Sequence, residues 1–220
     1  MSGQLVVVTG TGTGIGKTHF AEALVLAWRR KKGRIAGLKP VESGVTAGTA
    51  SDAARLAAVS SFHVKQFGVS FAPALSPHLC AREAGSAIDL TRLAAGIAAA
   101  RQRADGLVLE LPGGLFTPLS DTVLNADWAA SLAPDLLLVV APDRLGVLHD
   151  ALACVRAARA MGLRVAGLIV VHPGGADPST GRNAAELERL GLPVLASLPR
   201  APSAELCDAP DFANILSRLD

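Results

Sequence analysis

The chain has 220 residues, of which 50% are hydrophobic and 18% are charged, and its formal net charge at pH 7 is +2. So large an apolar fraction excludes a disordered chain, and so small a net charge argues against a surface that binds nucleic acid or anionic membranes. The three cysteines are widely spaced and form no Cys-x-x-Cys pair, which favours a reducing compartment without zinc or disulfides. No basic region with a long apolar segment opens the chain, so we expect a soluble cytoplasmic protein.

Short, nearly continuous apolar runs recur along the chain, as expected of strands that are buried on both faces of a parallel sheet. These runs span residues 5–8, 35–38, 107–111, 136–141, 165–171 and 194–198. Helix-like segments follow them, at residues 17–31, 51–60, 90–103, 121–132, 145–161, 183–190 and near 211–219. The alternation predicts one α/β domain over residues 1–220, with a mostly parallel sheet flanked by helices on both faces. Residues 64–87 are less periodic and are predicted to form a long loop.

The strongest motif lies between the first strand and the first helix and reads Thr9-Gly10-Thr11-Gly12-Thr13-Gly14-Ile15-Gly16-Lys17-Thr18. Its glycines let successive N–H groups turn toward phosphate oxygens, and the start of the following helix adds partial positive charge. Lys17 would reach the β- and γ-phosphates, and the Thr18 hydroxyl would bind Mg²⁺. The stretch thus predicts a P-loop NTPase-like fold, with a loop one residue longer than the common form. The predicted nucleotide-binding residues here are Gly14, Ile15, Gly16, Lys17, Thr18 and His19.

Polar residues also lie where ligands gather in a parallel sheet, beyond the carboxyl ends of strands. Lys39 follows the second strand and would place a second ammonium group beside Lys17, although a lysine there is often only a solvated strand end. Glu110 ends a buried strand, where its charge needs a partner such as Mg²⁺. Asp52 begins a helix, where an acidic residue also simply favours the helix dipole. Thr18, Asp52 and Glu110 are the predicted metal ligands, and the two carboxylates belong to the predicted nucleotide site.

In their order along the chain, these residues and further motifs resemble dethiobiotin synthetases over nearly the whole length. The further motifs are Lys39-Pro40-Val41-x-Ser43-Gly44, Ser76-Pro77-His78, Glu110-x-x-Gly113-Gly114 and Phe116-Thr117-Pro118-Leu119-Ser120-Asp121. The resemblance implies a homodimeric, Mg²⁺-dependent ligase of biotin biosynthesis that forms carbon–nitrogen bonds. Its substrates would be 7,8-diaminononanoate, CO₂ and ATP, and its products dethiobiotin, ADP and phosphate. One amine takes up CO₂ as a carbamate, the carbamate attacks the γ-phosphate, and the second amine closes the ureido ring.

The resemblance also implies roles for individual residues. Lys17 and Lys39 would be catalytic, stabilising charge on the transferring phosphoryl group. Ser43 would hydrogen-bond the amine or carbamate end of the substrate, and Gly146 and Val147 match the helix start that receives the substrate carboxylate from the partner subunit. A segment near the nucleobase corresponds to Pro199, Arg200 and Ala201.

The chain departs from the family pattern at several positions. Gly12 and Gly14 stand where acidic residues are common, Leu111 and Pro112 replace smaller residues after Glu110, and His149 replaces an asparagine. Val171-His172 stands where an asparagine would read adenine, so we predict loose nucleobase selection.

One alternative from a different class is a nucleotide switch of the partition-ATPase type, whose output is binding rather than a product. Gly12 occupies the place of the signature lysine of that class, five residues before Lys17. The charge balance also offers no surface for DNA or a membrane, so the enzyme hypothesis is favoured.

Overall fold

A computed structural model describes residues 2–31, 33–65 and 67–219, so the ends of the predicted domain, Met1 and Asp220, lie outside the described residues. Within them, six parallel strands form a sheet in the order β2-β5-β1-β6-β7-β8. The strands are β1 (Gln4–Gly10), β2 (Ile35–Leu38), β5 (Gly106–Glu110), β6 (Leu136–Pro142), β7 (Val165–Val171) and β8 (Val194–Leu198). This confirms the predicted parallel sheet, and its buried runs carry no polar alternation because helices cover both faces.

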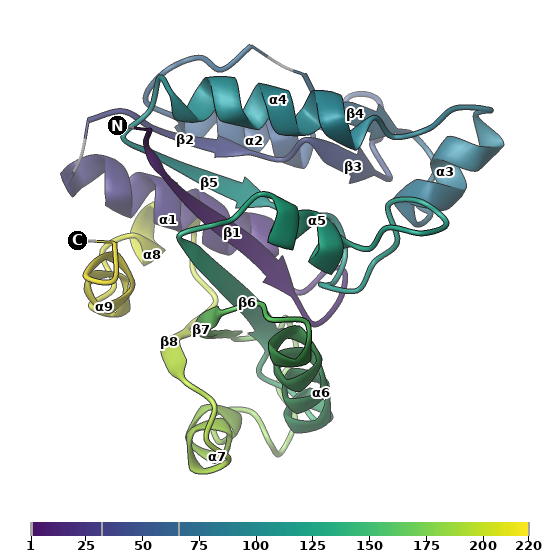
Figure 1. Ribbon diagram of the computed structural model, residues 1–220. Helices are drawn as coiled ribbons and strands as arrows, with labels where there is room; N and C mark the ends of the chain where they lie inside the picture. Colours follow the sequence, from purple (N-terminus) through teal and green to yellow (C-terminus); the bar gives the residue numbers. More distant parts are fainter. Residues whose placement is uncertain (1, 32, 66, 220) are drawn as a thin grey trace.

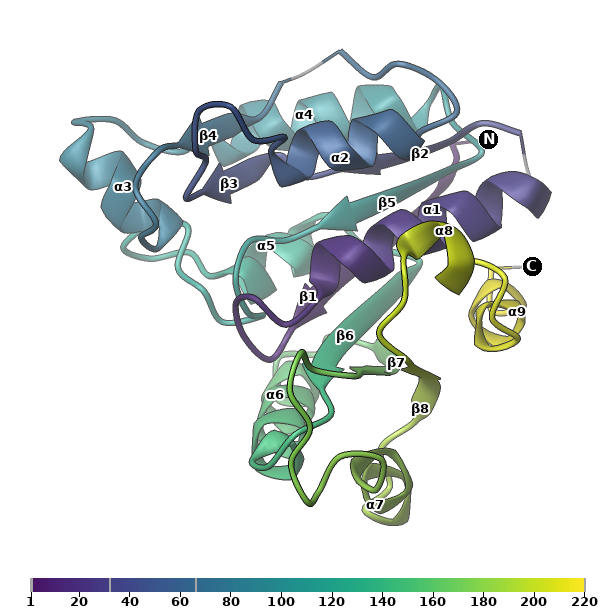
Figure 2. The same cartoon turned by 180° about the vertical axis from the view of Figure 1, so that it is seen from behind.

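Helices cover the two faces of this sheet in separate layers (Figures 1 and 2). One face is covered by α1 (Lys17–Lys31), α2 (Asp52–Val59), α8 (Ser203–Leu206) and α9 (Asp211–Leu216). The opposite face is covered by α4 (Leu90–Arg101), α5 (Asn125–Ser131), α6 (Val147–Ala160) and α7 (Asn183–Arg189). Each layer encloses its own apolar core. Among the described helices, none is long and apolar enough to cross a bilayer.

The central strands bring the chemically important residues to one edge of the sheet. β1 pairs with β5 so that Val8 lies opposite Glu110, and it pairs with β6 so that Gly10 lies opposite Val140. All three strands therefore end at the same edge, and the glycine-rich loop leaves β1 there. A Cβ added at Gly10 would stand 2.5 Å from Cδ1 of Ile15 and 3.0 Å from the Val140 carbonyl oxygen. The tight start of the loop thus requires glycine.

The predicted long loop at residues 64–87 is wrong. It contains β4 (Val69–Phe71) and α3 (Pro77–Glu83), and β4 pairs in parallel with β3 (Val41–Ser43) to form a second, two-stranded sheet. Strands of three residues are too short to show a periodicity, so β3 and β4 left no sequence signal. Pro77 begins α3 because the first turn of a helix has no need of that N–H group.

Two helix boundaries also differ from the prediction. The helix predicted over residues 121–132 begins at Asn125, because the preceding chain forms a turn in which the N–H groups of Leu119 and Ser120 bond the Val123 carbonyl. The short helix α8 was not predicted at all. The other boundaries agree to within about two residues, apart from α9, which ends at Leu216.

We expect Gly106→Ala to lower the free energy of unfolding by about 1–3 kcal/mol, because the added methyl overpacks the core. A Cβ at Gly106 would lie 2.3 Å from Cη2 of Trp28, which is 1% exposed. The matched control is Gly175→Ala, since no heavy atom of the described chain lies within 4 Å of a Cβ there. Urea unfolding measures both variants, and equal effects would contradict this account of the packing.

Candidate functional site

A cavity of about 580 Å³ opens at the carboxyl ends of β1, β2 and β5. The phosphate loop forms one wall, and β3, α2 and the chain after β5 form the others. Its lining includes the predicted residues Gly14, Ile15, Gly16, Lys17, Thr18, His19, Lys39, Ser43, Asp52 and Glu110. Residues far apart in the sequence therefore meet around one space, as the strand-end rule for parallel sheets predicts.

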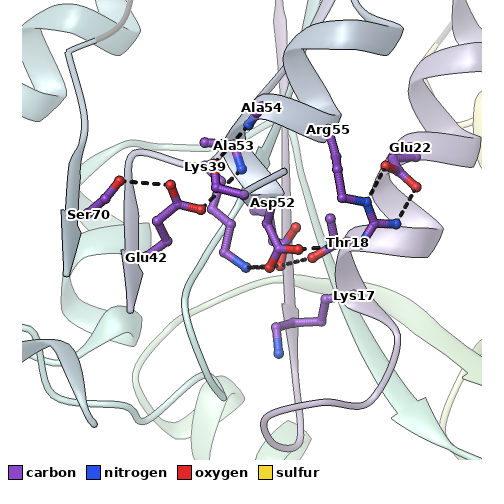
Figure 3. Close-up of polar contacts among 12 residues, drawn as sticks. Lys17, Thr18, Glu22, Lys39, Glu42, Asp52, Ala53, Ala54, Arg55 and Ser70 are labelled. Atoms are coloured by element: carbon purple, nitrogen blue, oxygen red, sulfur yellow. Dashed lines mark hydrogen bonds and ion pairs between the residues drawn. The ribbon is translucent and has the colours of Figure 1, made fainter. Parts of the chain in front are cut away.

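Lys39 lies at the centre of a compact ionic cluster in this cavity (Figure 3). Its ammonium group donates to Oε1 of Glu110 at 2.8 Å and to Oδ2 of Asp52. The Thr18 hydroxyl donates to the same Glu110 oxygen at 2.9 Å. The structure thus brings together Lys39 and the three predicted metal ligands.

Burial and ion pairing set the charge states of this cluster. Burial raises the pKa of Glu110, whose side chain is fully enclosed, although Lys39 opposes the rise. Burial also acts to raise the pKa of Asp52, but the hydrogen bond and charge of Lys39 outweigh it and lower that pKa. For Lys39 itself, the two carboxylates outweigh burial and raise the pKa. Lys39 is therefore held protonated between Asp52 and Glu110.

Lys17 is positioned differently from Lys39. Its ammonium group donates to the Gly12 carbonyl at 2.7 Å and so closes the phosphate loop on itself. The residue is 5% exposed, and burial lowers its pKa to about 8. The charges of Glu110 and Asp52 oppose this shift, and the charge of Lys39 adds to it. Lys17 is thus a cation that gains from an anionic partner, which a phosphate group would provide.

The donor set of the cluster fits Mg²⁺. Oε2 of Glu110 is buried and has no hydrogen-bond partner in the described structure, and a cation would satisfy it. The described residues contain no group of three or more His, Cys, Asp or Glu side chains that could hold a metal. Mg²⁺ is commonly bound by one or two carboxylates together with phosphate oxygens and water, and the cluster offers two carboxylates and a hydroxyl. The Thr18 hydroxyl, Asp52 and Glu110 are the side chains that would hold it.

A second cavity of about 810 Å³ adjoins the first across the phosphate loop. The two cavities share residues Thr13, Gly14, Ile15, Gly16 and His19. The second is also lined by Val171, His172, Pro199, Arg200 and Ala201, the segments predicted to lie near the base. His19 connects the two sides, because its Nε2 atom lies 2.5 Å from the Ala201 carbonyl oxygen. A nucleotide with its phosphates on the loop would therefore place its base in this second cavity.

The predicted substrate residues are not all brought together. Ser43 lines the first cavity, whereas Gly146 and Val147 are not among the described residues that line either cavity. Gly146 adopts a left-handed conformation, with φ of 93°, at the start of α6, and the preceding Leu145 is 81% exposed. Within one chain, Ser43 and the α6 start therefore do not face one common space.

Sequence reasoning missed three buried or half-buried charges that support the site. Glu42 accepts hydrogen bonds from the Ser70 hydroxyl at 2.7 Å and from the Ala53 N–H group at 3.2 Å, which fixes the start of α2 against β3 and β4. Glu22 on α1 pairs with Arg55 on α2. Glu22 left a signal, since it is an isolated acid within the apolar stretch of residues 20–28. Arg55 left no such signal, because an arginine on a helix is usually a solvent-exposed residue.

This chain is similar in sequence to a protein family and to several known proteins. A protein-family profile described as an AAA domain matches residues 4–205. The chain is 38% identical to the ATP-dependent dethiobiotin synthetase BioD of Anaeromyxobacter dehalogenans strain 2CP-C, over 94% of this chain and 91% of that protein. It is 38% identical to the protein of the same name from Ralstonia nicotianae, over 96% of each chain.

Solved structures share the fold at low sequence identity. The cell division ATPase MinD of Pyrococcus furiosus matches with a TM-score of 0.60 and 17% identity, over 99% of this chain and 100% of that one. Apo McdA from Cyanthece matches with a TM-score of 0.59 and 12% identity, over 99% of each chain. These likenesses extend to the P-loop α/β fold and no further.

We expect nucleotide affinity to fall as pH rises through about 8, because Lys17 loses its proton near that pH. The sign follows from linkage: a bound triphosphate favours the protonated ammonium, so above this pH binding must take up a proton. Affinity should then fall by up to about tenfold for each further pH unit. Calorimetry across this range measures it. In Lys17→Ala the dependence should disappear, and its persistence would assign the titration to another group.

We expect the four nucleoside triphosphates to bind with affinities within about 1–3 kcal/mol of one another, the range of an apolar contact. The Val171 side chain offers no hydrogen bond, and Nδ1 of His172 already contacts the Pro173 carbonyl at 2.7 Å. Dissociation constants measured at matched Mg²⁺ test this. A preference for ATP above about 10³-fold would mean that a polar group in the second cavity reads the base.

Proposed function

Because this chain belongs to the family of ATP-dependent dethiobiotin synthetases, we propose that its two cavities bind ATP and 7,8-diaminononanoate for carboxylation and ring closure. Members of the family are ATP-dependent ligases of biotin biosynthesis, and this chain is one of them. The finer assignments, which concern the substrates other than ATP, Mg²⁺, the homodimer and the site residues, form the proposal. The observation that carries it is the cluster in which Lys39 lies between Asp52 and Glu110, in the cavity that the phosphate loop borders.

The chain's cations would stabilise the charge that develops during phosphoryl transfer. One amine of the substrate takes up CO₂ as a carbamate, and the carbamate oxygen then attacks the γ-phosphate of ATP. Lys17 and Lys39 both line the first cavity and would contact the transferring group and its attacking oxygen. Preorganised cations of this kind lower the barrier mainly by electrostatic stabilisation.

Ring closure would need positioning more than further charge. Ser43 lies at the end of β3 and would hydrogen-bond the amine or carbamate end of the substrate. The second amine then attacks the carbamic-phosphoric anhydride, which closes the five-membered ureido ring and expels phosphate. Mg²⁺, when held by Thr18, Asp52 and Glu110, would neutralise phosphate charge.

The far end of the substrate would be bound by a second copy of the chain. Gly146 and Val147 open α6 away from the first cavity, and the exposed Leu145 beside them is suited to an interface. A homodimer would place this helix start, with its partial positive charge, over the partner's substrate carboxylate. We also assign the enzyme to the cytoplasm, which the free thiols of Cys80, Cys154 and Cys207 favour.

A partition-type nucleotide switch receives less support. The structural likeness to MinD rests on 17% identity and concerns the fold. Gly12 accepts a hydrogen bond from Lys17 through its carbonyl, at the position where that class carries a second lysine.

The direct test incubates the protein with 7,8-diaminononanoate, bicarbonate, Mg²⁺ and ATP and detects the product by mass spectrometry. We expect dethiobiotin, ADP and phosphate in equal amounts. ATP hydrolysis that does not depend on the diamine, with no dethiobiotin, would refute the proposal and favour the nucleotide switch.

We expect Lys39→Ala to lower turnover by about 10²–10³-fold, the usual cost of losing one preorganised stabiliser of a transition state. The variant removes the cation from between two carboxylates that are available to metal, so its Mg²⁺ requirement should not rise. Steady-state kinetics and a Mg²⁺ titration measure both quantities, and circular dichroism checks that the variant is folded. Turnover at the wild-type rate would remove Lys39 from the mechanism.

Glu110→Gln should have the opposite signature. The substitution keeps the size and the acceptor for Thr18 but removes the charge offered to Mg²⁺. We expect the Mg²⁺ concentration at half-maximal activity to rise. An unchanged Mg²⁺ titration would reduce Glu110 to a structural strand end.

A further inference from the structure

We propose that Glu22 is a positioning residue that acts on two parts of the site. Through one chain of hydrogen bonds, the first arm, it orients Asp52 in the ionic cluster around Lys39. Through a second, the second arm, it orients the segment after β8 that borders the base cavity. The inference rests on the proposed function for its catalytic readouts. Glu22 lies on α1, one turn after the phosphate loop, and is 5% exposed. It is not among the described residues that line either cavity, so it would act through its neighbours.

The first arm runs from Glu22 to Asp52 through Arg55. Arg55 donates to Oε1 of Glu22 from Nε at 2.9 Å and to Oε2 from Nη2 at 2.8 Å, a two-pronged pairing that fixes the guanidinium plane. Its remaining nitrogen, Nη1, lies 3.5 Å from Oδ1 of Asp52, one turn earlier on α2. Figure 3 shows Arg55 extending from α2 to Glu22, with Asp52 on the same helix beside Thr18. Asp52 is thereby held from one side by Arg55 and from the other by Lys39.

The second arm runs from Glu22 to the segment that borders the base cavity. The Ser203 hydroxyl donates to Oε2 of Glu22 at 3.2 Å, and Ser203 directly follows Ala201 and Pro202, which line that cavity. Nδ1 of His19 also lies 4.0 Å from Oε2, while Nε2 of the same ring contacts the Ala201 carbonyl. Glu22 therefore holds this segment through the Ser203 hydrogen bond, and the His19 ring lies between Glu22 and the Ala201 carbonyl.

The chemistry of these groups argues for a positioning role beyond ordinary packing. A buried carboxylate is costly unless each oxygen is paired, and here both oxygens are occupied by groups that belong to different walls of the site. α1 follows the phosphate loop directly, so contacts to Glu22 fix the positions of α2 and of the segment after β8 relative to that loop. Small displacements of reacting groups can cost up to about 10²-fold in rate.

The arms predict separable effects of single substitutions. Arg55→Ala should lower kcat and raise the half-saturating Mg²⁺ concentration, each by about 3–10-fold, with little change in nucleotide affinity. Ser203→Ala should weaken nucleotide affinity by a similar factor and leave the Mg²⁺ dependence alone. Glu22→Ala should produce both changes. Because Glu22 acts on Asp52 through Arg55, Glu22→Ala and Arg55→Ala should be strongly non-additive in the Mg²⁺ dependence, whereas Arg55→Ala and Ser203→Ala should combine additively.

Arg29→Ala is the matched control. Arg29 is also on α1 and also contacts the α2 helix, through a hydrogen bond from Nη1 to the Val59 carbonyl at 2.6 Å, at the end distant from the site. We expect it to leave kcat, Mg²⁺ dependence and nucleotide affinity unchanged. Glu22→Gln, which keeps the side-chain volume, repeats the test should Glu22→Ala fold poorly, and it should impair the Arg55 arm because an amide NH₂ meets the guanidinium.

The readouts are nucleotide affinity by calorimetry, with and without Mg²⁺, together with steady-state kinetics and Tm. Separate effects of the two arms, joined in the Glu22 variant, would support the proposal. A Glu22 variant with lowered Tm but unchanged affinity, kcat and Mg²⁺ dependence would overturn it, as would equal effects from Arg29→Ala. The calorimetric measurement does not require dethiobiotin to form. A protein that binds nucleotide but makes no product would therefore refute the proposed function, and the effects of the Glu22, Arg55 and Ser203 variants on nucleotide affinity would still test this inference.

Discussion

The arrangement of the site depends on the burial of the Glu110 carboxylate at the tip of β5. A fully buried charge must find a cation, and in this fold Lys39 supplies it from the neighbouring β2 while Thr18 supplies a hydroxyl from α1. Losing one partner of a buried ion pair costs about 3–5 kcal/mol, so the cluster constrains the elements that carry it. The same pairing holds the Lys39 ammonium where a phosphoryl group would need it.

Further charged residues around this cluster hold the neighbouring elements in place. Asp52 is held by Lys39 on one side and by Arg55 on the other, and Glu42 fixes the N–H group of Ala53 that follows it. Arg55 in turn pairs with Glu22 on α1, and Glu42 lies in β3, so α2 cannot shift without breaking an interaction with α1 or with the small β3–β4 sheet. The wall of the cavity that α2 forms is therefore held in place because buried and half-buried charges on separate elements satisfy one another.

Much of the architecture could be predicted from local patterns. The apolar runs predicted five of the six strands of the main sheet with an error of no more than one residue at either end. The glycine-rich stretch predicted the position of the phosphate loop and the start of α1. Glu110 was singled out because a charge at the end of a buried strand needs a partner, whereas Lys39 was singled out by its place after the second strand and by the family resemblance. The small sheet was missed because β3 and β4 pair only with each other, and a three-residue strand is specified by that pairing rather than by its own sequence.

The sequence by itself determined the parallel α/β fold, the nucleotide loop and the identity of the charged groups, because each of these depends on the order and spacing of residues along the chain. Tertiary structure decided which charges meet. Glu22 and Arg55 are 33 positions apart, and Glu22 and Ser203 are 181 apart, so no local periodicity relates them. Their contact exists because the sheet order sets α1 between α2 and α8, and electrostatic pairing depends on distance in space rather than on separation in sequence.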